Sequence, residues 1–168
     1  MSQITLPENL QTERLELKQV SVQWLEEIFA ENKGNVGRYF YKFELLGDLQ
    51  TWINENRREQ EDGRKLEMVI LDYNSKEFLG MVSLQKLNIY PELGIWIKES
   101  AQGKGYGKEA VLKLINWYKL NFGAEEKIRY LAENSNFASI KLARSLVEIE
   151  AKGEIVNEEG LVFQEFVI

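Results

Sequence analysis

The chain has 168 residues, and its 21 lysines and arginines against 27 aspartates and glutamates give a net charge of −6. This length is enough for one domain with its own core, and 44% hydrophobic residues exclude intrinsic disorder. The chain contains no Cys and no His, which excludes disulfides, thiolate metal sites and Ser-His or Cys-His nucleophiles. The acidic balance argues against a basic surface for nucleic acid.

Targeting and membrane signals are missing from the pattern. The first ten residues lack the basic stretch followed by an apolar run that marks a secretory signal. No apolar stretch approaches the roughly 18 residues that a membrane-spanning helix requires. We therefore expect one domain over residues 1–168, in the cytoplasm, with no membrane partner, no nucleic-acid partner and no metal.

The first half of the chain predicts strands and helices in a regular order. Apolar and polar side chains alternate over residues 12–20, which predicts a strand. Helices are expected over 21–32 and over 48–60, the second with Asp48 as its N-cap. The segment 33–47 holds three glycines and four aromatic residues, which indicates a loop or a broken helix. Three strands joined by tight turns are then expected over residues 65–73, 78–86 and 93–98.

The second half starts with a glycine-rich loop over residues 100–107 and an amphipathic helix that ends at Gly123. This helix is long enough to be a crossover, so the strands on either side of it, 93–98 and 127–132, should be parallel neighbours. The remaining pattern predicts a helix and a hairpin, over residues 137–147, 148–156 and 161–168.

The glycine-rich loop carries the clearest chemical signal. Gly103, Gly105 and Gly107 stand at alternate positions, so backbone N–H groups can converge there without side chains in the way. The start of the following helix adds unpaired N–H groups, which makes a cradle for an anion such as a pyrophosphate. Lys104 and Lys108 add positive charge to this segment. A flexible turn at a helix start, without a ligand, is the alternative.

Two common phosphate-binding loops do not fit. A P-loop needs Ser or Thr after the Gly-Lys pair, whereas Gly107-Lys108 is followed by Glu109. A dinucleotide fingerprint needs a Gly-x-Gly-x-x-Gly spacing at the first strand of a parallel sheet, and here the third glycine comes one residue too early, after three antiparallel strands.

The run from Gln102 to Gly107 does match Gln/Arg-x-x-Gly-x-Gly/Ala, and the chain thereby resembles the GCN5-related N-acetyltransferase (GNAT) superfamily. Asn136 to Ser139 looks like that superfamily's Asn-x-x-Ser motif, which opens the helix after its fifth strand. The segments 12–15 and 78–80 resemble the branch of ribosomal-protein N-terminal and spermidine acetyltransferases. The resemblance covers about the whole chain. It implies an α+β fold, an α/β sandwich whose mixed, mostly antiparallel sheet of about seven strands splays between the fourth and fifth, with about four helices.

The resemblance also implies acetyl-CoA as the co-substrate. Backbone N–H groups of the loop would hold its pyrophosphate, and the strand before the loop would pair with its pantetheine arm. Asn136 would bind the pantetheine amides and Lys141 the phosphates, although Asn136 and Ser139 could equally serve as helix caps alone. The expected acetyl-CoA contacts are Ile95, Trp96, Ile97, Gln102, Gly103, Lys104, Gly105, Tyr106, Gly107, Lys108, Asn136 and Lys141.

The implied reaction is direct transfer of acetyl to a primary amine on a small molecule, a polyamine, a peptide or a protein N-terminus. Because the chain has no His, the base must be a carboxylate or a water chain, and Glu92 is the candidate. An exposed turn residue beside Pro91 is the alternative for that side chain. Ser139 is the candidate that helps the thiolate leave. Arg38, Tyr39 and Tyr41 are the candidate acceptor contacts.

Two departures from the superfamily pattern leave another function open. Many members carry Gly-Phe after the Asn-x-x-Ser helix and a Tyr acid nearby, and residues 145–150 here hold neither. The alternative is therefore a catalytically silent module that binds acyl-CoA or regulates. A monomer and a homodimer are both compatible with the sequence.

Overall fold

The computed structural model describes residues 5–146 and 148–168. Within these residues, eight strands form one sheet in the order β1-β2-β3-β4-β5-β6-β8-β7. The strands are β1 (Asn9–Gln11), β2 (Leu15–Gln19), β3 (Leu66–Asp72), β4 (Phe78–Gln85), β5 (Glu92–Ile97), β6 (Arg129–Glu133), β7 (Glu150–Val156) and β8 (Val162–Val167). The helices are α1 (Leu25–Glu31), α2 (Gly34–Tyr39), α3 (Leu46–Glu61), α4 (Tyr106–Phe122) and α5 (Phe137–Arg144), with 3₁₀ turns at Val22–Trp24 and Glu99–Ala101.

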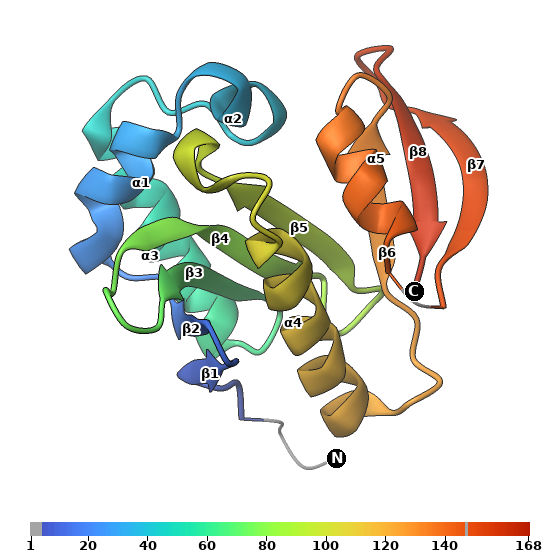
Figure 1. Cartoon of the computed structure of the whole chain (residues 1–168), viewed down its shortest axis with the longest axis horizontal. Helices are drawn as coiled ribbons and strands as arrows, with labels where there is room; N and C mark the ends of the chain where they lie inside the picture. The colour runs from blue at the N-terminus through green and yellow to red at the C-terminus, as the bar shows by residue number, and fades with distance from the viewer. Residues whose placement is uncertain (1–4, 147) are drawn as a thin grey trace.

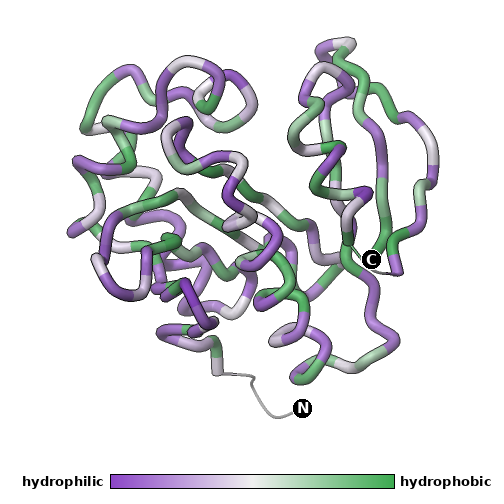
Figure 2. The backbone as a smooth tube through the Cα atoms, viewed as in Figure 1, coloured by the Kyte–Doolittle hydropathy of each residue, from purple (hydrophilic) through white to green (hydrophobic). Residues whose placement is uncertain are grey.

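Helices cover both faces of the sheet (Figure 1). One buried cluster lies between the sheet and α4 and α5, and a second lies between the sheet and α1, α2 and α3. Strand β3 serves both, because Met68 and Ile70 point to the first cluster whereas Val69 and Leu71 point to the second. Figure 2 shows hydrophobic stretches in the sheet and a mixture of hydrophobic and hydrophilic residues along the helices. Within the described residues, none of the helices is both long and apolar enough to cross a membrane.

The predicted α+β fold and order of elements are confirmed, with differences at places where local patterns are weak. Strand β1 was not predicted, because three residues are too few for alternation to show. The segment 33–47 contains the short helix α2. Helix α3 begins at Leu46, two residues before the predicted cap, so Asp48 lies in its first turn and caps nothing with its side chain.

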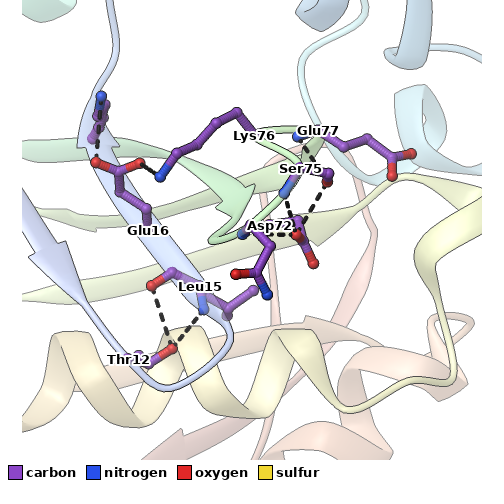
Figure 3. A network of polar contacts seen from close by, with 9 residues as sticks. Thr12, Leu15, Glu16, Asp72, Ser75, Lys76 and Glu77 are labelled. Carbon is purple, nitrogen blue, oxygen red and sulfur yellow. Dashed lines mark hydrogen bonds and ion pairs between the residues drawn. The ribbon is translucent and has the colours of Figure 1, made fainter.

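Two turns at the same end of neighbouring strands are held by local polar contacts (Figure 3). In the β1–β2 turn, Thr12 Oγ1 accepts from the N–H of Leu15 at 2.9 Å. In the β3–β4 turn, Asp72 accepts from the N–H of Ser75 at 2.8 Å, and the bonds from Ser75 hold the pKa of that carboxyl below its ordinary value. Lys76, in the β3–β4 turn, forms a 2.8 Å ion pair with Glu16 on β2.

Candidate functional site

Strands β5 and β6 pair over fewer residues than any other neighbouring strands in the described sheet. These parallel strands pair at two positions, Glu92 with Arg129 and Leu93 with Tyr130. Beyond them the strands diverge, and Figure 1 shows β5 and β6 meeting near one end and separating toward the other. The predicted parallel pairing of these strands is therefore confirmed. Four residues of β5 have no partner strand on this side.

The backbone of β5 offers hydrogen bonds at this divergence. The N–H of Lys98 donates to the carbonyl oxygen of Leu79 at 2.8 Å, which sets the phase of the antiparallel β4–β5 ladder. By the alternation of that ladder, the polar groups of Trp96 face β4, whereas those of Ile95 and Ile97 face away from it. We call the backbone of Ile95 and Ile97 the open edge. Of the three predicted strand contacts, these two can pair with a ligand through the backbone.

The glycine-rich loop lies where the open edge ends. Gly103 and Gly105 have φ of 76° and 81°, a left-handed conformation that favours glycine. A Cβ on Gly107 would lie 3.5 Å from Cγ1 of Ile97 and 3.8 Å from Cδ2 of Leu142, ordinary contact distances that place the start of α4 against β5 and α5. The first N–H groups of α4 have no partners within the helix, and they lie next to the open edge. These are the backbone groups on which the predicted anion cradle depends, and the cradle stays a prediction.

Arg14 braces this loop, which sequence reasoning missed. Its Nη1 donates to the carbonyl oxygen of Lys104 at 3.1 Å, and its guanidinium lies 4.8 Å from the ring centre of Tyr106. Its Nε donates to Oε2 of Glu109, in the first turn of α4, at 2.7 Å. Burial raises the pKa of Glu109, but hydrogen bonds from Thr12 and Arg14 outweigh it and leave that pKa below its ordinary value. Arg14 belongs to the Thr12–Leu15 segment that carries the resemblance to the superfamily branch, and that resemblance does not indicate the contact.

The polar side chains of the loop have different partners. Nε2 of Gln102 donates to the carbonyl oxygen of Ile97 at 2.8 Å, so the loop itself satisfies one group of the open edge. Nζ of Lys108 donates to the carbonyl oxygen of Ser145 at 2.7 Å and joins α4 to the end of α5. Lys104 is exposed. Both predicted cations are exposed, and of these bonds only that of Lys108 links α4 to α5.

The Asn-x-x-Ser motif lies at the start of α5, as predicted. Oδ1 of Asn136 accepts from the N–H of Ser139 at 3.1 Å, so the side chain caps α5. That bond uses the amide oxygen and leaves the amide nitrogen available to a ligand. Lys141 is exposed and lines a surface hollow together with Phe137 and Arg144.

Ser139 has a partner that the sequence did not indicate. Its Oγ lies 2.6 Å from the hydroxyl of Tyr130, which comes from β6 and is 2% exposed. Burial raises the pKa of Tyr130 to about 12, and the bond with Ser139 offsets only part of this effect. Tyr130 is one of the last residues of β6 to pair with β5, so this pair of hydroxyls lies beside the divergence.

Glu92 lies at the closed end of the same divergence. Its Oε2 is 3.0 Å from Nζ of Lys86 and 3.8 Å from Nη1 of Arg129, and its side chain is 24% exposed. The carboxylate therefore lies between two cations, at the paired end of the strand that carries the open edge. The sequence pattern indicates neither of these two ion pairs.

The three candidate acceptor contacts, Arg38, Tyr39 and Tyr41, lie in two different places. The hydroxyl of Tyr39 donates to the carbonyl oxygen of Ser135 at 3.1 Å, and the guanidinium of Arg38 lies 5.2 Å from the ring centre of Tyr39. Tyr41 is 56% exposed and its ring centre lies 6.3 Å from that of Trp52, on α3. Arg38 and Tyr39 thus lie at the divergence, whereas Tyr41 lies over α3.

A comparison with protein families decides the family. The model of the acetyltransferase (GNAT) domain matches residues 14–146, which include the loop, the open edge and the Asn-x-x-Ser motif. The chain belongs to the GNAT acetyltransferase family. No curated protein sequence matches it at a significant level.

Solved structures share the fold of this GNAT protein. A Vibrio cholerae protein assigned as a ribosomal-protein-serine acetyltransferase matches with a TM-score of 0.83 and 19% identity, over 95% of this chain and 96% of the other. Spermidine N-acetyltransferase from Vibrio cholerae, solved with CoA and spermine, matches with a TM-score of 0.78 and 20% identity, over 94% and 96%. The Salmonella typhimurium enzyme that modifies the N-terminal serine of L7/L12 matches with a TM-score of 0.79 and 17% identity, over 94% and 95%. At these identities the likeness establishes the fold of the GNAT protein.

Proposed function

We propose that this GNAT protein transfers the acetyl group of acetyl-CoA to a primary amine. The open edge is the observation that carries the proposal, because Ile95 and Ile97 offer backbone groups that no strand takes. The pantetheine arm, with its two amides, would pair there as a substitute strand. The loop from Gln102 to Gly107 and the start of α4 would hold the pyrophosphate. Asn136 and Lys141 would bind the pantetheine and the phosphates.

The proposed chemistry is a direct attack of the amine nitrogen on the thioester carbon. The oxygen that gains charge would accept from an N–H of the open edge, which is fixed before the reaction. The amine must lose a proton, and the proposed acceptor of that proton is Glu92, directly or through water. An alkylamine with a pKa near 10.4 needs this help more than an α-amine near 7.7–8.0. The C–S bond then breaks and its electron pair stays on sulfur, beside Ser139.

The acceptor would enter between α2 and the β6–α5 turn, where Arg38 and Tyr39 lie. Two solved relatives are named for a ribosomal-protein serine and for spermidine, so peptides and polyamines form the first panel to test. Tyr41, on the far side of Phe40, would influence the acceptor through the aromatic cluster it forms with Trp52.

One observation favours a second candidate, a CoA-binding module without turnover. The carboxylate of Glu92 already has ion-pair partners in Lys86 and Arg129, so its oxygens are engaged by the protein's own side chains. Both candidates bind CoA, but the silent module releases no thiol.

The first experiment is thermal unfolding with and without saturating acetyl-CoA, with ATP and NAD as controls. A ligand at 100 times its Kd adds about 2.7 kcal/mol to the free energy of unfolding, which shifts the midpoint visibly. We expect a shift with acetyl-CoA and none with the controls. Thiol release with the amine panel then separates the enzyme from the silent module. Absence of a shift with acetyl-CoA contradicts both.

A further inference from the structure

We propose that Tyr130 is a positioning residue, which turns the hydroxyl hydrogen of Ser139 toward the thioester sulfur so that the thiolate leaves with a hydrogen bond from Ser139. This inference rests on the proposed function and deepens it. Its basis is the 2.6 Å contact between the two hydroxyl oxygens and the different burial of the two side chains.

Burial decides which hydroxyl donates. Tyr130 is 2% exposed, and within the described residues its hydroxyl has Ser139 as its hydrogen-bond partner. If Ser139 donated, the phenol hydrogen would be left buried without an acceptor, which is costly. Ser139 is half-buried and can direct its own hydrogen elsewhere. The favoured arrangement is therefore a chain in which Tyr130 donates to Ser139 and the hydrogen of Ser139 is free.

The pair of hydroxyls lies on the same face of the sheet as the side chains of Ile95 and Ile97. Tyr130 is the partner of Leu93, the last β5 residue that pairs with β6, so its side chain leaves the sheet where the open edge begins. Tyr130, Ile95 and Ile97 all contact the buried cluster on the α4 and α5 face. Ser139, in the first turn of α5, thus meets the thioester from the face on which the pyrophosphate loop lies.

The pKa values argue that no proton is transferred. The pKa of Tyr130, about 12, lies more than three pH units above the roughly 8.5 of a thiol. Protonation of the thiolate from the phenol is therefore disfavoured by more than about a thousandfold. In the balanced step the N–C bond forms, the C–S bond breaks with its electron pair on sulfur, and the amine proton goes to Glu92 or water. Tyr130 and Ser139 keep their protons and donate hydrogen bonds.

The test measures the thiol pKa of bound CoA, from the ultraviolet absorbance of the thiolate against pH. In the wild-type protein we expect this pKa below that of free CoA. Tyr130→Phe and Ser139→Ala should each raise it, by about one pH unit, and Ser139→Thr should keep it near the wild-type value because the hydroxyl remains. Tyr118→Phe is the matched control, since Tyr118 is also 2% exposed but lies on α4, stacked on Phe122. It should leave the thiol pKa unchanged.

Kinetics give an independent measure. Tyr130→Phe should lower kcat about tenfold with an unchanged KM for acetyl-CoA, since the hydrogen bond strengthens as sulfur gains charge. If the thiol pKa of bound CoA is the same in the wild-type protein and in Tyr130→Phe, the role of Tyr130 is overturned. The proposed function stays intact in that case. Failure of CoA to bind the wild-type protein overturns both. A fold defect would show as a lower thermal midpoint, which the Tyr118→Phe control calibrates.

Discussion

The hydroxyl of Tyr39 donates to the carbonyl oxygen of Ser135 at 3.1 Å and lies 3.3 Å from its Oγ, which joins α2 to the β6–α5 turn. Oγ of Ser135 in turn donates to the carboxylate of Glu133, at the end of β6. These contacts cross from one side of the divergence to the other, between residues that are 96 positions apart. The bridge holds the two sides at a set separation at the proposed acceptor entrance.

Tyr39→Phe tests this bridge. The substitution removes one hydroxyl and keeps the ring beneath Arg38, so we expect a three- to tenfold change in the KM for the amine, equivalent to about 1 kcal/mol. The Kd for acetyl-CoA should stay unchanged. Steady-state kinetics with two amines of different length measure the effect. Tyr73→Phe, on the β3–β4 turn, is the control. Equal kinetics in Tyr39→Phe and the wild-type protein would remove Tyr39 from the acceptor site.

Arg14→Lys tests the bracing of the pyrophosphate loop. Lysine keeps the charge but loses the planar fork that bonds Lys104 and Glu109 together. We expect the Kd for acetyl-CoA, measured by calorimetry, to rise about tenfold, which is about 1.4 kcal/mol. Arg57→Lys is the control, because the ion pair of Arg57 with Glu61 is exposed on α3. A wild-type Kd in Arg14→Lys would mean that the loop keeps its shape without the fork.

Glu109 predicts a pH dependence of stability. Its pKa in the folded chain lies below 4.5, so the carboxylate contributes stability that is fully present above that pH and is lost as pH falls through the folded pKa. We expect Glu109→Gln to lower the free energy of unfolding by about 1 kcal/mol at pH 7, a modest value because solvent screens part of the interaction. Urea unfolding should show this difference shrinking below pH 4.5. Glu61→Gln should show little difference at any pH, and a difference for Glu109→Gln that persists in acid would contradict the assignment.

Glu92→Gln tests the proposed base. The amide keeps the shape of the side chain and one acceptor oxygen but cannot take a proton, so kcat should fall about 10²- to 10⁴-fold. Acetyl-CoA should still shift the thermal midpoint, because Glu92 is not a proposed contact for the cofactor. Glu16→Gln is the matched control, since Glu16 is also ion-paired on the sheet, with Lys76 and Lys18. An unchanged rate across pH would remove Glu92 from the mechanism.

The features that the sequence predicted are local ones. Alternation and turn residues predicted β2 to β6, and the alternating glycines predicted the loop between β5 and α4. The cap by Asn136 also follows from residue type and a spacing of three. Each of these depends on neighbours within one turn or one strand.

The features that escaped prediction depend on how distant segments pack. The contact of Tyr130 with Ser139 requires the angle at which α5 lies on β6, and the bracing by Arg14 joins positions that are 90 and 95 residues apart. The buried pair of Lys65 and Glu67 is a further case, with 2.9 Å between Nζ and Oε2. Burial raises the pKa of Glu67, and no periodicity in the strand indicated that these charges would lie beneath α3.

The two-position seam between β5 and β6 leaves β6, β7 and β8 with few backbone links to the remainder of the sheet. A molecule that pairs with the backbone of Ile95 and Ile97 would then stabilise the packing of these three strands against the rest of the sheet. Native-state hydrogen exchange should register the difference: slowing on addition of acetyl-CoA should be greatest for amides of β6 and β8 and smallest for β2 and β3. Such a protein would carry part of its own tertiary stability in its co-substrate, and its resistance to proteolysis would follow the supply of acetyl-CoA.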